Sequence, residues 1–480
     1  MKHLRYRADI DGLRAVAVLG VVIYHAFPQN LPGGFVGVDI FFVISGYLIS
    51  GILYKGVREG GFSFSEFYAR RIRRLFPALI TVLLLCLGYG YFILLGDEYR
   101  QMGKHVAAGT LFIQNMVFWK ESGYWDITST LKPLLHLWSL AVEEQFYIIF
   151  PPLLLLFWKK KWPMVPLLWI LLIASLISNL IMSYQSRETD FFLTPYRAWE
   201  FLGGSLLAWW HYGKNHEEEA PFGNILSVLG IILLAVSMIV LKEGQPYPGW
   251  RAILPVAGSI MLIAAGRKSW VNSRILSHPA VVWIGLISYP LYLFHWPALS
   301  FVHIVKGERP ADLYIAAALA ITFLLTIATY YLVEKPIRFA KSRATIPLLV
   351  VAFILTGLLG CATWQGIINP NAIEYFRKME KYIADNKYYF GFKKLQENTT
   401  IHQYKIGGDV ISTLFLGDSN MEQYAPRIGY LMENSKDCGA VFITAPGVPP
   451  IPNVEHYCVE ECKTLIQEFR KVLARNNDIE

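Results

Sequence analysis

The chain has 480 residues, of which 54% are hydrophobic and only 17% are charged. A soluble domain carries about 25% charged residues, so the composition excludes an ordinary soluble protein and indicates one that lies in a membrane. The formal net charge is +8, but the basic residues lie in short segments between long apolar blocks and form no basic face, which argues against nucleic acid as a partner.

Apolar stretches long enough, or nearly long enough, to cross a bilayer recur along the chain; a crossing takes about 20 residues. We expect a polytopic α-helical protein with a ten-span core and an eleventh, linking span at 345–365. The ten core spans are about 10–27, 35–54, 76–95, 134–158, 163–184, 195–211, 223–241, 252–266, 279–303 and 311–333. Another apolar block, 103–119, contains Lys104 and His105 and is expected to lie in the interface or to re-enter.

The positions of Lys and Arg predict the orientation, because cytosolic loops carry an excess of both. The residues concerned are Lys2, Arg5, Arg7, Arg70, Arg71, Arg73, Arg74, Lys159, Lys160 and Lys161. They place the N-terminus and the loops before the third span and after the fourth span in the cytosol. Eleven crossings of the plasma (inner) membrane, with lipids as partners, then put residues after about 366 in the periplasm or outside the cell. Asp11 and Arg14 mark the first block as a retained span rather than a signal peptide.

The composition changes abruptly after the last span. The predicted parts are a membrane domain at 5–340, a linking helix at 341–370, a linker at 371–408 and a partial α/β domain at 409–480. The linker is rich in Lys, Glu, Asn and Tyr, as a solvated linker or helical spacer would be. A β-like run at 410–416, a helical segment at 421–433 and a second strand at 439–444 are typical of the start of an α/β sheet.

The five cysteines predict neither a metal site nor a defined disulfide. Cys86 and Cys361 lie in apolar spans and are expected to pack there. Cys438, Cys458 and Cys462 fall on the exported side, where one pair at most can close among the three. No metal ligand set is expected, because the pair at 458 and 462 lacks a second pair at zinc spacing.

Ionisable residues inside apolar spans are costly and usually functional. Arg14 and His25 are eleven residues apart, so they share one face of the first span, separated by about 16 Å along its axis. A short hairpin at 28–34 brings Asp39 to a depth comparable with His25, where its carboxylate would fix the tautomer of the imidazole. The alternatives are a topology anchor for Arg14, a helix-end role for His25 and an interface position for Asp39.

These residues belong to a series of motifs. The segments are YRADIDGLR at 6–14, His25, GFVGVDIFFVISGYLI at 34–49, the arginines between 70 and 74, HLWSLAVEEQFY at 136–147 and VEKPIR at 333–338. In this order they resemble the acyltransferase 3 family of integral membrane proteins, over roughly residues 5–340.

The resemblance implies an O-acyltransferase, often an O-acetyltransferase, that modifies exported glycans such as lipopolysaccharide O-antigen or peptidoglycan. It implies acyl-CoA, usually acetyl-CoA, as the cytosolic donor and no permanently bound cofactor. The implied donor-binding residues, whose guanidinium forks suit phosphate, are Arg14, Arg71, Arg73 and Arg74. The implied catalytic residues are His25, as base or transient acyl carrier, and Asp39. The implied substrate-binding residues are Ser45, Tyr47, His136, Glu143 and Glu144.

Other interpretations of the same residues stay open. The arginines can be ordinary topology markers, and His136 and Glu143, seven residues apart on one helix face, can form a buried structural ion pair. A transporter or flippase that moves its substrate without bond chemistry is the alternative from another class. A catalytically inactive assembly subunit is a third possibility.

The exported part carries a second resemblance. Leu416-Gly417-Asp418-Ser419-Asn420 resembles the first block of the SGNH hydrolase-like domains often fused to this family, and Gly447-Val448-Pro449-Pro450 is similar to the second block. The resemblance makes Ser419 the catalytic nucleophile. The later blocks, which supply Asn and Asp-x-x-His, are not found before Glu480, and a serine needs its base. We therefore expect an incomplete triad and a second polypeptide that supplies the remainder.

Overall fold

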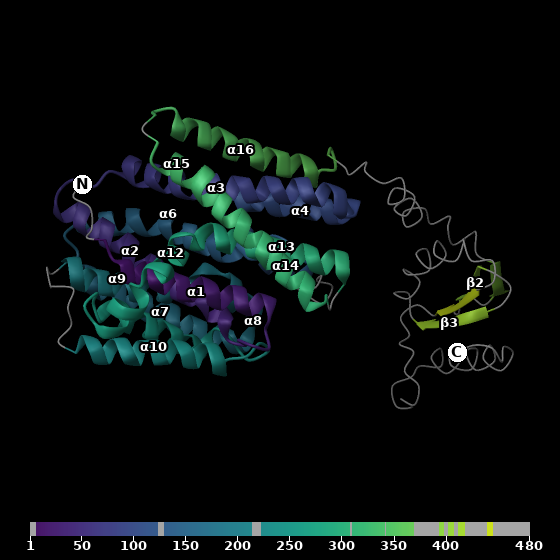
Figure 1. Ribbon diagram of the computed structural model, residues 1–480, viewed down its shortest axis with the longest axis horizontal. Helices are drawn as coiled ribbons and strands as arrows, with labels where there is room; N and C mark the ends of the chain where they lie inside the picture. Colours follow the sequence, from purple (N-terminus) through teal and green to yellow (C-terminus); the bar gives the residue numbers. More distant parts are fainter. Residues whose placement is uncertain are drawn as a thin grey trace. The chain divides into compact units, whose positions relative to one another are not determined.

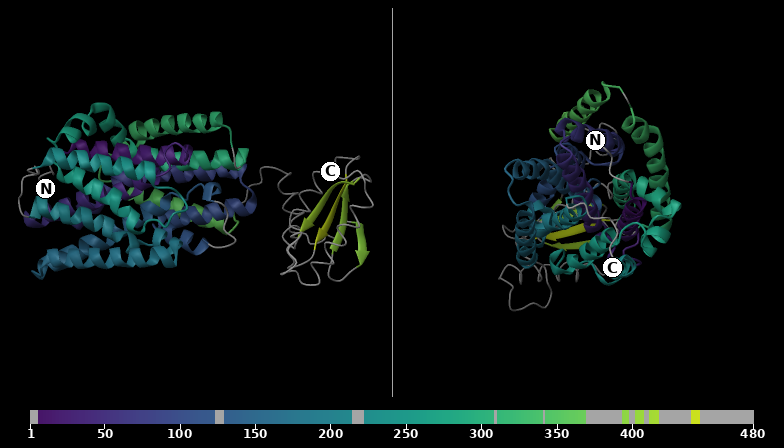
Figure 2. Two further views of the ribbon diagram at one scale, coloured as in Figure 1. Left: turned by 90° about the horizontal axis from the view of Figure 1, so that it is seen from below. Right: turned by 90° about the vertical axis from the view of Figure 1, so that its left-hand side faces the viewer.

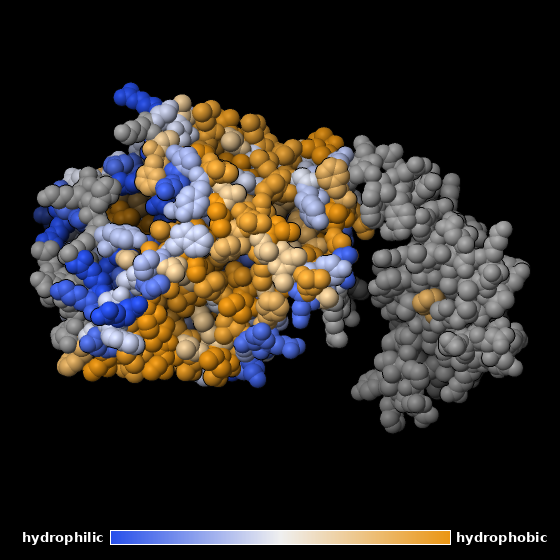
Figure 3. Space-filling view, in the orientation of Figure 1, coloured by the Kyte–Doolittle hydropathy of each residue, from blue (hydrophilic) through white to orange (hydrophobic). Residues whose placement is uncertain are grey.

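The computed structural model describes residues 6–122, 129–213, 222–307, 310–340 and 342–368, and the four strands given below. The chain divides into two compact units, Met1–Asn369 and Pro370–Glu480. The helices of the first unit lie side by side in one bundle (Figure 1), with α16 on its outer surface against α3 and α4 (Figure 2). A broad hydrophobic band separates hydrophilic patches at the two ends of the bundle (Figure 3).

Seven helices of the described residues are long and apolar enough to cross a bilayer. They are α2 (Gly37–Arg58), α3 (Phe64–Ile93), α6 (Leu137–Lys159), α7 (Met164–Gln185), α10 (Gly223–Val240), α14 (Asp312–Ala328), whose helical path continues to Arg338, and α16 (Thr345–Trp364). The first helix, α1 (Ala8–Ala26), has 19 residues but carries Asp9, Asp11 and Arg14. The first unit is thus a multi-pass membrane domain, and the total of eleven crossings stays a prediction.

The other helical elements of this unit are shorter or less apolar. The α-helices are α4 (Gly96–Thr110), α5 (Gln114–Glu121), α8 (Arg187–Phe192), α9 (Thr194–Ala208), α11 (Ile253–Ala264), α12 (Pro279–Leu286), α13 (Ser288–Lys306) and α15 (Lys335–Arg338). The short 3-10 and π elements are η1 (Gly34–Val36), η2 (Ser129–Leu131), η3 (Trp209–Gly213), η4 (Gly249–Ala252), η5 (Asn272–Leu276) and η6 (Thr329–Glu334).

The predicted span at 279–303 is not one continuous helix, because the chain forms two consecutive helices there. α12 ends at Leu286 and α13 begins at Ser288. Pro290 has no N–H to donate to the Leu286 carbonyl, and its ring clashes with a carbonyl four residues earlier, so one continuous helix is disfavoured. Proline is tolerated in the first turn of a helix, and that is its place in α13.

Two further boundaries differ from the prediction. α3 begins at Phe64, twelve residues before the predicted span, so the arginines at 70–74 lie within a helix rather than in a loop. The block 103–119 is split between α4 and α5 by a turn in which Phe112 has a φ of 53°. Gln145 of α6 holds this turn, since its Nε2 donates to the Phe112 carbonyl at 2.9 Å and to Asn115 Oδ1 at 2.8 Å.

Glycines bring α2 and α9 into backbone contact. A Cβ atom on Gly46 would lie 2.0 Å from the Phe201 carbonyl oxygen, and one on Gly204 would lie 2.2 Å from the Val43 carbonyl oxygen. Small residues of this kind allow close helix packing in membranes. The close approach sets the distance between the polar side chains that α2 and α9 direct at one another.

The second unit contains a four-stranded sheet in the order β1-β2-β4-β3. The strands are β1 (Lys393–Glu397), β2 (His402–Gly407), β3 (Ile411–Gly417) and β4 (Gly439–Thr444); β3 and β4 are parallel, and the other pairs are antiparallel. The predicted strands at 410–416 and 439–444 are confirmed. The segment expected to be a linker, however, contains β1 and β2. β1 lies at the edge of the sheet. Because edge strands commonly carry charged residues, the composition of β1 resembles that of a linker.

Candidate active site

Three adjoining cavities lie within the first unit. The arginine cavity, of about 240 Å³, is lined by Arg7, Arg14, Arg74 and Arg338, among others. The central cavity, of about 90 Å³, is lined by Ser45, Arg71, Glu143 and Tyr147, among others. The histidine cavity, of about 380 Å³, is lined by His25, Asp39, His136 and Arg197, among others.

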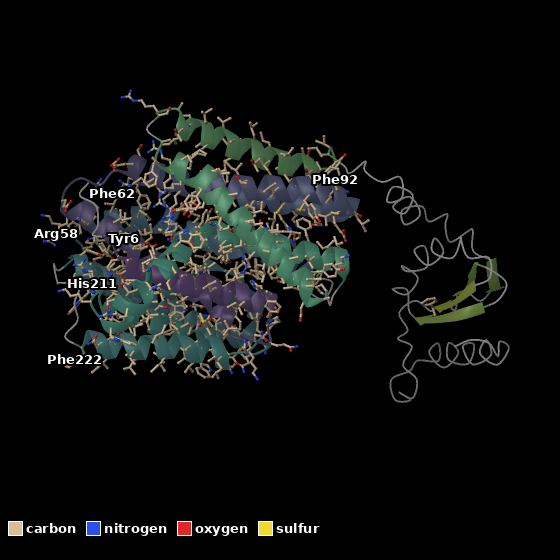
Figure 4. The ribbon with its side chains drawn as sticks, in the orientation of Figure 1. Tyr6, Arg58, Phe62, Phe92, His211 and Phe222 are labelled. Atoms are coloured by element: carbon tan, nitrogen blue, oxygen red, sulfur yellow. The ribbon has the colours of Figure 1, made fainter. Side chains whose placement is uncertain are left out.

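Shared lining residues place the three cavities next to one another in this order. Arg14 and Arg74 line both the arginine and the central cavity, and Val38 and Tyr292 line both the central and the histidine cavity. Tyr6, which lines the arginine cavity, lies at the end of the bundle opposite Phe92 (Figure 4). α1 begins near Tyr6 and runs away from it, so the predicted shared face of α1 presents an arginine first and a histidine in its last turn.

The arginines around the first two cavities differ in how they are paired. Arg14 pairs with Asp11 at 3.1 Å, and Arg71 pairs with Glu144 at 3.1 Å while lying 3.5 Å from the centre of the Tyr147 ring. Arg74 makes no hydrogen bond or ion pair within the described part of the chain. Arg74 is partly buried, and a cation of this kind suits an anionic ligand.

Arg73 lies on another side of α3 and lines none of the three cavities. Residues 71 and 74 are three apart and share a helix face, whereas residue 73 is turned by about 100° from residue 74. The four arginines predicted to bind the donor are therefore not one cluster. The structure brings three of them together and leaves the fourth apart.

Glu143 is the centre of a hydrogen-bonded group in the central cavity. Ser45 Oγ donates to its carboxylate at 2.5 Å, and the Tyr147 hydroxyl donates to the same oxygen. The alternative of an ion pair between His136 and Glu143 is wrong: among the described residues neither ring nitrogen of His136 meets a partner with hydrogen-bond geometry, and Glu143 is bonded to Ser45 and Tyr147 instead. Tyr47, expected beside these residues, instead lies in the arginine cavity with its hydroxyl 3.0 Å from His211 Nδ1.

Imidazole rings gather in the histidine cavity. His25 Nδ1 lies 3.0 Å from His295 Nε2 of α13, and His295 Nδ1 lies 2.6 Å from the Tyr292 carbonyl oxygen. His136, just before α6, is 3% exposed, and its ring centre lies 5.8 Å from that of His295. Neither ring nitrogen of His136 meets a partner with hydrogen-bond geometry in the described residues, although the Leu293 carbonyl lies near the ring.

The predicted contact between His25 and Asp39 is not the one that forms. The Asp39 carboxylate accepts hydrogen bonds from Arg197 Nη2 at 2.9 Å and from the Tyr247 hydroxyl at 2.5 Å. Arg197 also pairs with Glu200 at 2.9 Å, and all these charged groups are buried. The glycine-mediated contact of α2 with α9 places Arg197 against Asp39, so the carboxylate and the imidazole line one cavity with different partners.

Three functional candidates were missed by the sequence reasoning: His295, Arg197 and Tyr247. The first two carry the signal that identified His25, an ionisable side chain within an apolar stretch, while Tyr247 has no comparable signal. Ser419 and Cys438, Cys458 and Cys462 lie outside the described residues. Among the residues that the structure does describe, no group of three or more His, Cys, Asp and Glu side chains is arranged to hold a metal ion.

Fold and site together define a multi-pass helical protein with arginines and histidines in adjoining internal cavities. The family model described as "Acyltransferase domain" (Acyl_transf_3) matches residues 7–334. Since this is more than half of the chain, the protein belongs to the acyltransferase 3 family.

Curated relatives from Staphylococcus aureus extend this result. O-acetyltransferase OatA of strain NCTC 8325 / PS 47 is 34% identical over 350 residues, which is 70% of this chain and 57% of the relative. A protein of strain MSSA476, provisionally named an O-acetyltransferase, is 35% identical over 357 residues, which is 70% of this chain and 58% of the relative. The chain therefore spans less than two thirds of the length of these relatives.

Proposed function

We propose that the protein is an O-acyltransferase that carries an acetyl group from cytosolic acetyl-CoA to a hydroxyl group of an exported cell-envelope glycan. Lipopolysaccharide O-antigen and peptidoglycan are the candidate acceptors. One observation carries the proposal: counting the described residues alone, the adjoining cavities contain an arginine without an ion pair at one end and an imidazole with a ring nitrogen that has no hydrogen-bond partner at the other. Membership of the acyltransferase 3 family and the names of the relatives support acyl transfer as the chemistry.

The arginine cavity is the proposed donor site. Arg74 and Arg14 would bind the phosphates of coenzyme A, with the thioester directed toward the central cavity. Charge-assisted bonds from guanidinium to phosphate are among the strongest that side chains make. The loop charges that predict a cytosolic position for this end agree with a cytosolic donor.

The histidine cavity is the proposed acceptor site. His25 would take the proton of the glycan hydroxyl as its oxygen attacks the thioester carbonyl, and would then give the proton to the departing coenzyme A thiolate. The bond formed is an ester C–O bond, and the bond broken is the thioester C–S bond. His136, with two ring nitrogens lacking partners of hydrogen-bond geometry, would bind the acceptor or the polarised acyl oxygen.

A transfer assay in nanodiscs tests this function. Nanodiscs expose both faces of the protein, so purified protein with [14C]acetyl-CoA and a soluble glycan acceptor should release coenzyme A and yield an acetylated glycan detected by mass spectrometry. His25→Ala protein in identical nanodiscs is the control for spontaneous transfer. A transporter or flippase makes no product here, so the absence of acetylated glycan with every tested acceptor would reject acyl transfer in favour of that alternative.

A further inference from the structure

His295 is placed to determine which ring nitrogen of His25 carries a proton. The two residues are 270 positions apart, yet their ring planes lie within 10° of parallel and the 3.0 Å contact joins ring edges. His295 is fully buried at 0% exposure. The centre of the Trp296 ring lies 4.5 Å from the centre of the His25 ring. The Trp296 ring is itself held by a 2.8 Å hydrogen bond from Nε1 to the Lys132 carbonyl. The imidazole of His25 is therefore held on two sides.

The backbone near His295 determines the tautomer of the His295 ring. Its Nδ1 lies 2.6 Å from the Tyr292 carbonyl oxygen, and a carbonyl can only accept, so Nδ1 carries the hydrogen. Within the described part of the chain no carboxylate bonds to this ring, and a buried charge without a counterion is strongly disfavoured. The ring is therefore neutral, and its Nε2 has a lone pair and no hydrogen.

The tautomer of His295 determines the tautomer of His25. An acceptor at His295 Nε2 requires a donor at His25 Nδ1, because the two nitrogens are 3.0 Å apart. A neutral His25 with its hydrogen on Nδ1 has its lone pair on Nε2. That atom has no hydrogen-bond partner among the described residues, and His25 lines the 380 Å³ histidine cavity.

We infer that His295 is a positioning residue that holds His25 in the Nδ1–H tautomer and thereby makes Nε2 the atom that accepts the acceptor's proton. The inference rests on the proposed function for its chemical meaning. When Nε2 gains the proton, the Nδ1–H···Nε2 bond to His295 becomes charge-assisted, which stabilises the imidazolium formed in the transition state. The tautomer-fixing role expected of the Asp39 carboxylate is thus filled by a neutral imidazole.

The first test measures the tautomer and needs no turnover. Protein with 15N-labelled histidine in lipid is studied by solid-state NMR, and the His25 signals are assigned by their loss in His25→Ala. The expected result is a protonated Nδ1 and an unprotonated Nε2. A proton on Nε2 in place of Nδ1 would overturn the inference, whether or not the protein transfers acetyl groups.

The second test compares two variants of His295 in the transfer assay. His295→Leu removes the acceptor, so kcat should fall at least tenfold while KM for acetyl-CoA stays within twofold. In His295→Gln the amide oxygen can take the place of Nε2, so this variant should recover a substantial part of kcat. A kcat like that of the parent in His295→Leu, or equal losses in both variants at full membrane accumulation, would reject the positioning role. If His295→Leu fails to fold, the NMR result still decides.

Discussion

The two ends of the membrane domain's interior handle charge in opposite ways. In the arginine and central cavities, charged side chains pair with one another, as Arg14 does with Asp11 and Arg71 with Glu144. Arg74 has no such ion pair with any residue that the structure describes. In the histidine cavity the ring contact of His25 at hydrogen-bond distance, within the described part of the chain, is to a second imidazole. The carboxylate of Asp39, which lines the same cavity, forms an ion pair with Arg197. One end therefore suits an anion, and the other suits a proton transfer.

This separation has a chemical reason. A general base works best when it is neutral before the reaction and its basicity is close to that needed at working pH. An imidazole paired with a carboxylate in an apolar interior is more basic and is held more strongly as a cation once it is protonated. Binding of a polyanionic donor needs the reverse, a cation that stays charged. The predictions below test whether these two requirements are met at opposite ends.

The largest effect is expected from removal of the imidazole at position 25. General acid–base catalysis contributes about 10²–10⁴-fold to rate, so His25→Ala should lose acetyl transfer by that factor while acetyl-CoA binding is retained. The measurement is transfer in nanodiscs per amount of folded protein. His278→Ala, at the exposed start of α12, is the matched control and should behave like the parent. If His25→Ala transfers normally, the base lies elsewhere, and His136 is the next residue to test.

At the other end, Arg74→Ala should weaken donor binding and leave the chemistry of bound donor largely intact. A hydrogen bond to a charged group contributes about 1.5–3 kcal/mol, so the Kd for acetyl-CoA should rise by roughly ten- to a hundredfold. Arg74→Lys should recover only part of the affinity, because an ammonium group cannot make a forked contact. Isothermal titration measures the affinity directly.

The control for this variant lies on the same helix. Arg70 is exposed and pairs with Glu66 at 2.6 Å, so Arg70→Ala should bind acetyl-CoA like the parent. Equal weakening in both variants would mean that α3 contributes only general positive charge. Arg73→Ala should resemble the control, because its side chain lines none of the cavities; this departs from the expectation drawn from the motif alone.

The sequence predicts the candidate site better than it predicts the contacts within it. Arg14 and His25 stand out because an ionisable residue in an apolar span costs free energy, and helical geometry then places them on one face. The partner of His25 cannot be found this way, because His295 lies 270 residues away and tertiary packing alone brings the two together. Asp39 is close to His25 in sequence and was therefore the expected partner of His25. The close packing of α2 on α9 instead places Arg197 against the Asp39 carboxylate.

The fold shows the same limit. Most apolar blocks became helices near the predicted positions, since a backbone in lipid must satisfy its own hydrogen bonds and a helix does so within one segment. The break at Ile287 depends on where Pro290 falls relative to a carbonyl one turn earlier, and a hydropathy pattern does not record this. The strand Lys393–Glu397 was interpreted as linker because an edge strand needs no apolar sequence.

A smaller effect on transfer, but a clear one on stability, is expected at Asp39. Asp39→Asn leaves Arg197 with Glu200 as its remaining buried partner, and disruption of a buried ion pair costs about 3 kcal/mol, so the midpoint of thermal unfolding should fall. Because His25 does not bond to Asp39, kcat per folded molecule should change much less than in His25→Ala. Asp97→Asn, whose side chain is 95% exposed, is the control. A loss of kcat as large as that of His25→Ala would restore the carboxylate to the catalytic step.

The smallest effect is expected at Glu121, which lies beside a segment that lines the histidine cavity through Ser129 and Thr130. Glu121 bonds to Lys104 at 2.6 Å and to His105 at 2.9 Å, and it lies 3.8 Å from Lys132. The segment that begins with Ser129 and leads to the cavity is thereby tied to α4 and α5. Glu121→Gln weakens these pairs, so it should lower the unfolding midpoint by a few degrees and change transfer little. Glu66→Gln, with an exposed ion pair, is its control.

The pH dependence of this difference identifies its source. Burial raises the pKa of Glu121, but the hydrogen bonds and charges of His105 and Lys104 outweigh it and lower the pKa to about 2. Because this folded-state pKa lies below the ordinary value of 4.5, the carboxylate stabilises the fold fully above that value and loses its contribution as the pH falls toward 2. The gap in unfolding midpoint between parent and Glu121→Gln should therefore be constant near neutral pH and shrink below pH 4.5. A gap that persists unchanged in acid would mean that packing, and not charge, ties the segment that begins with Ser129 to α4 and α5.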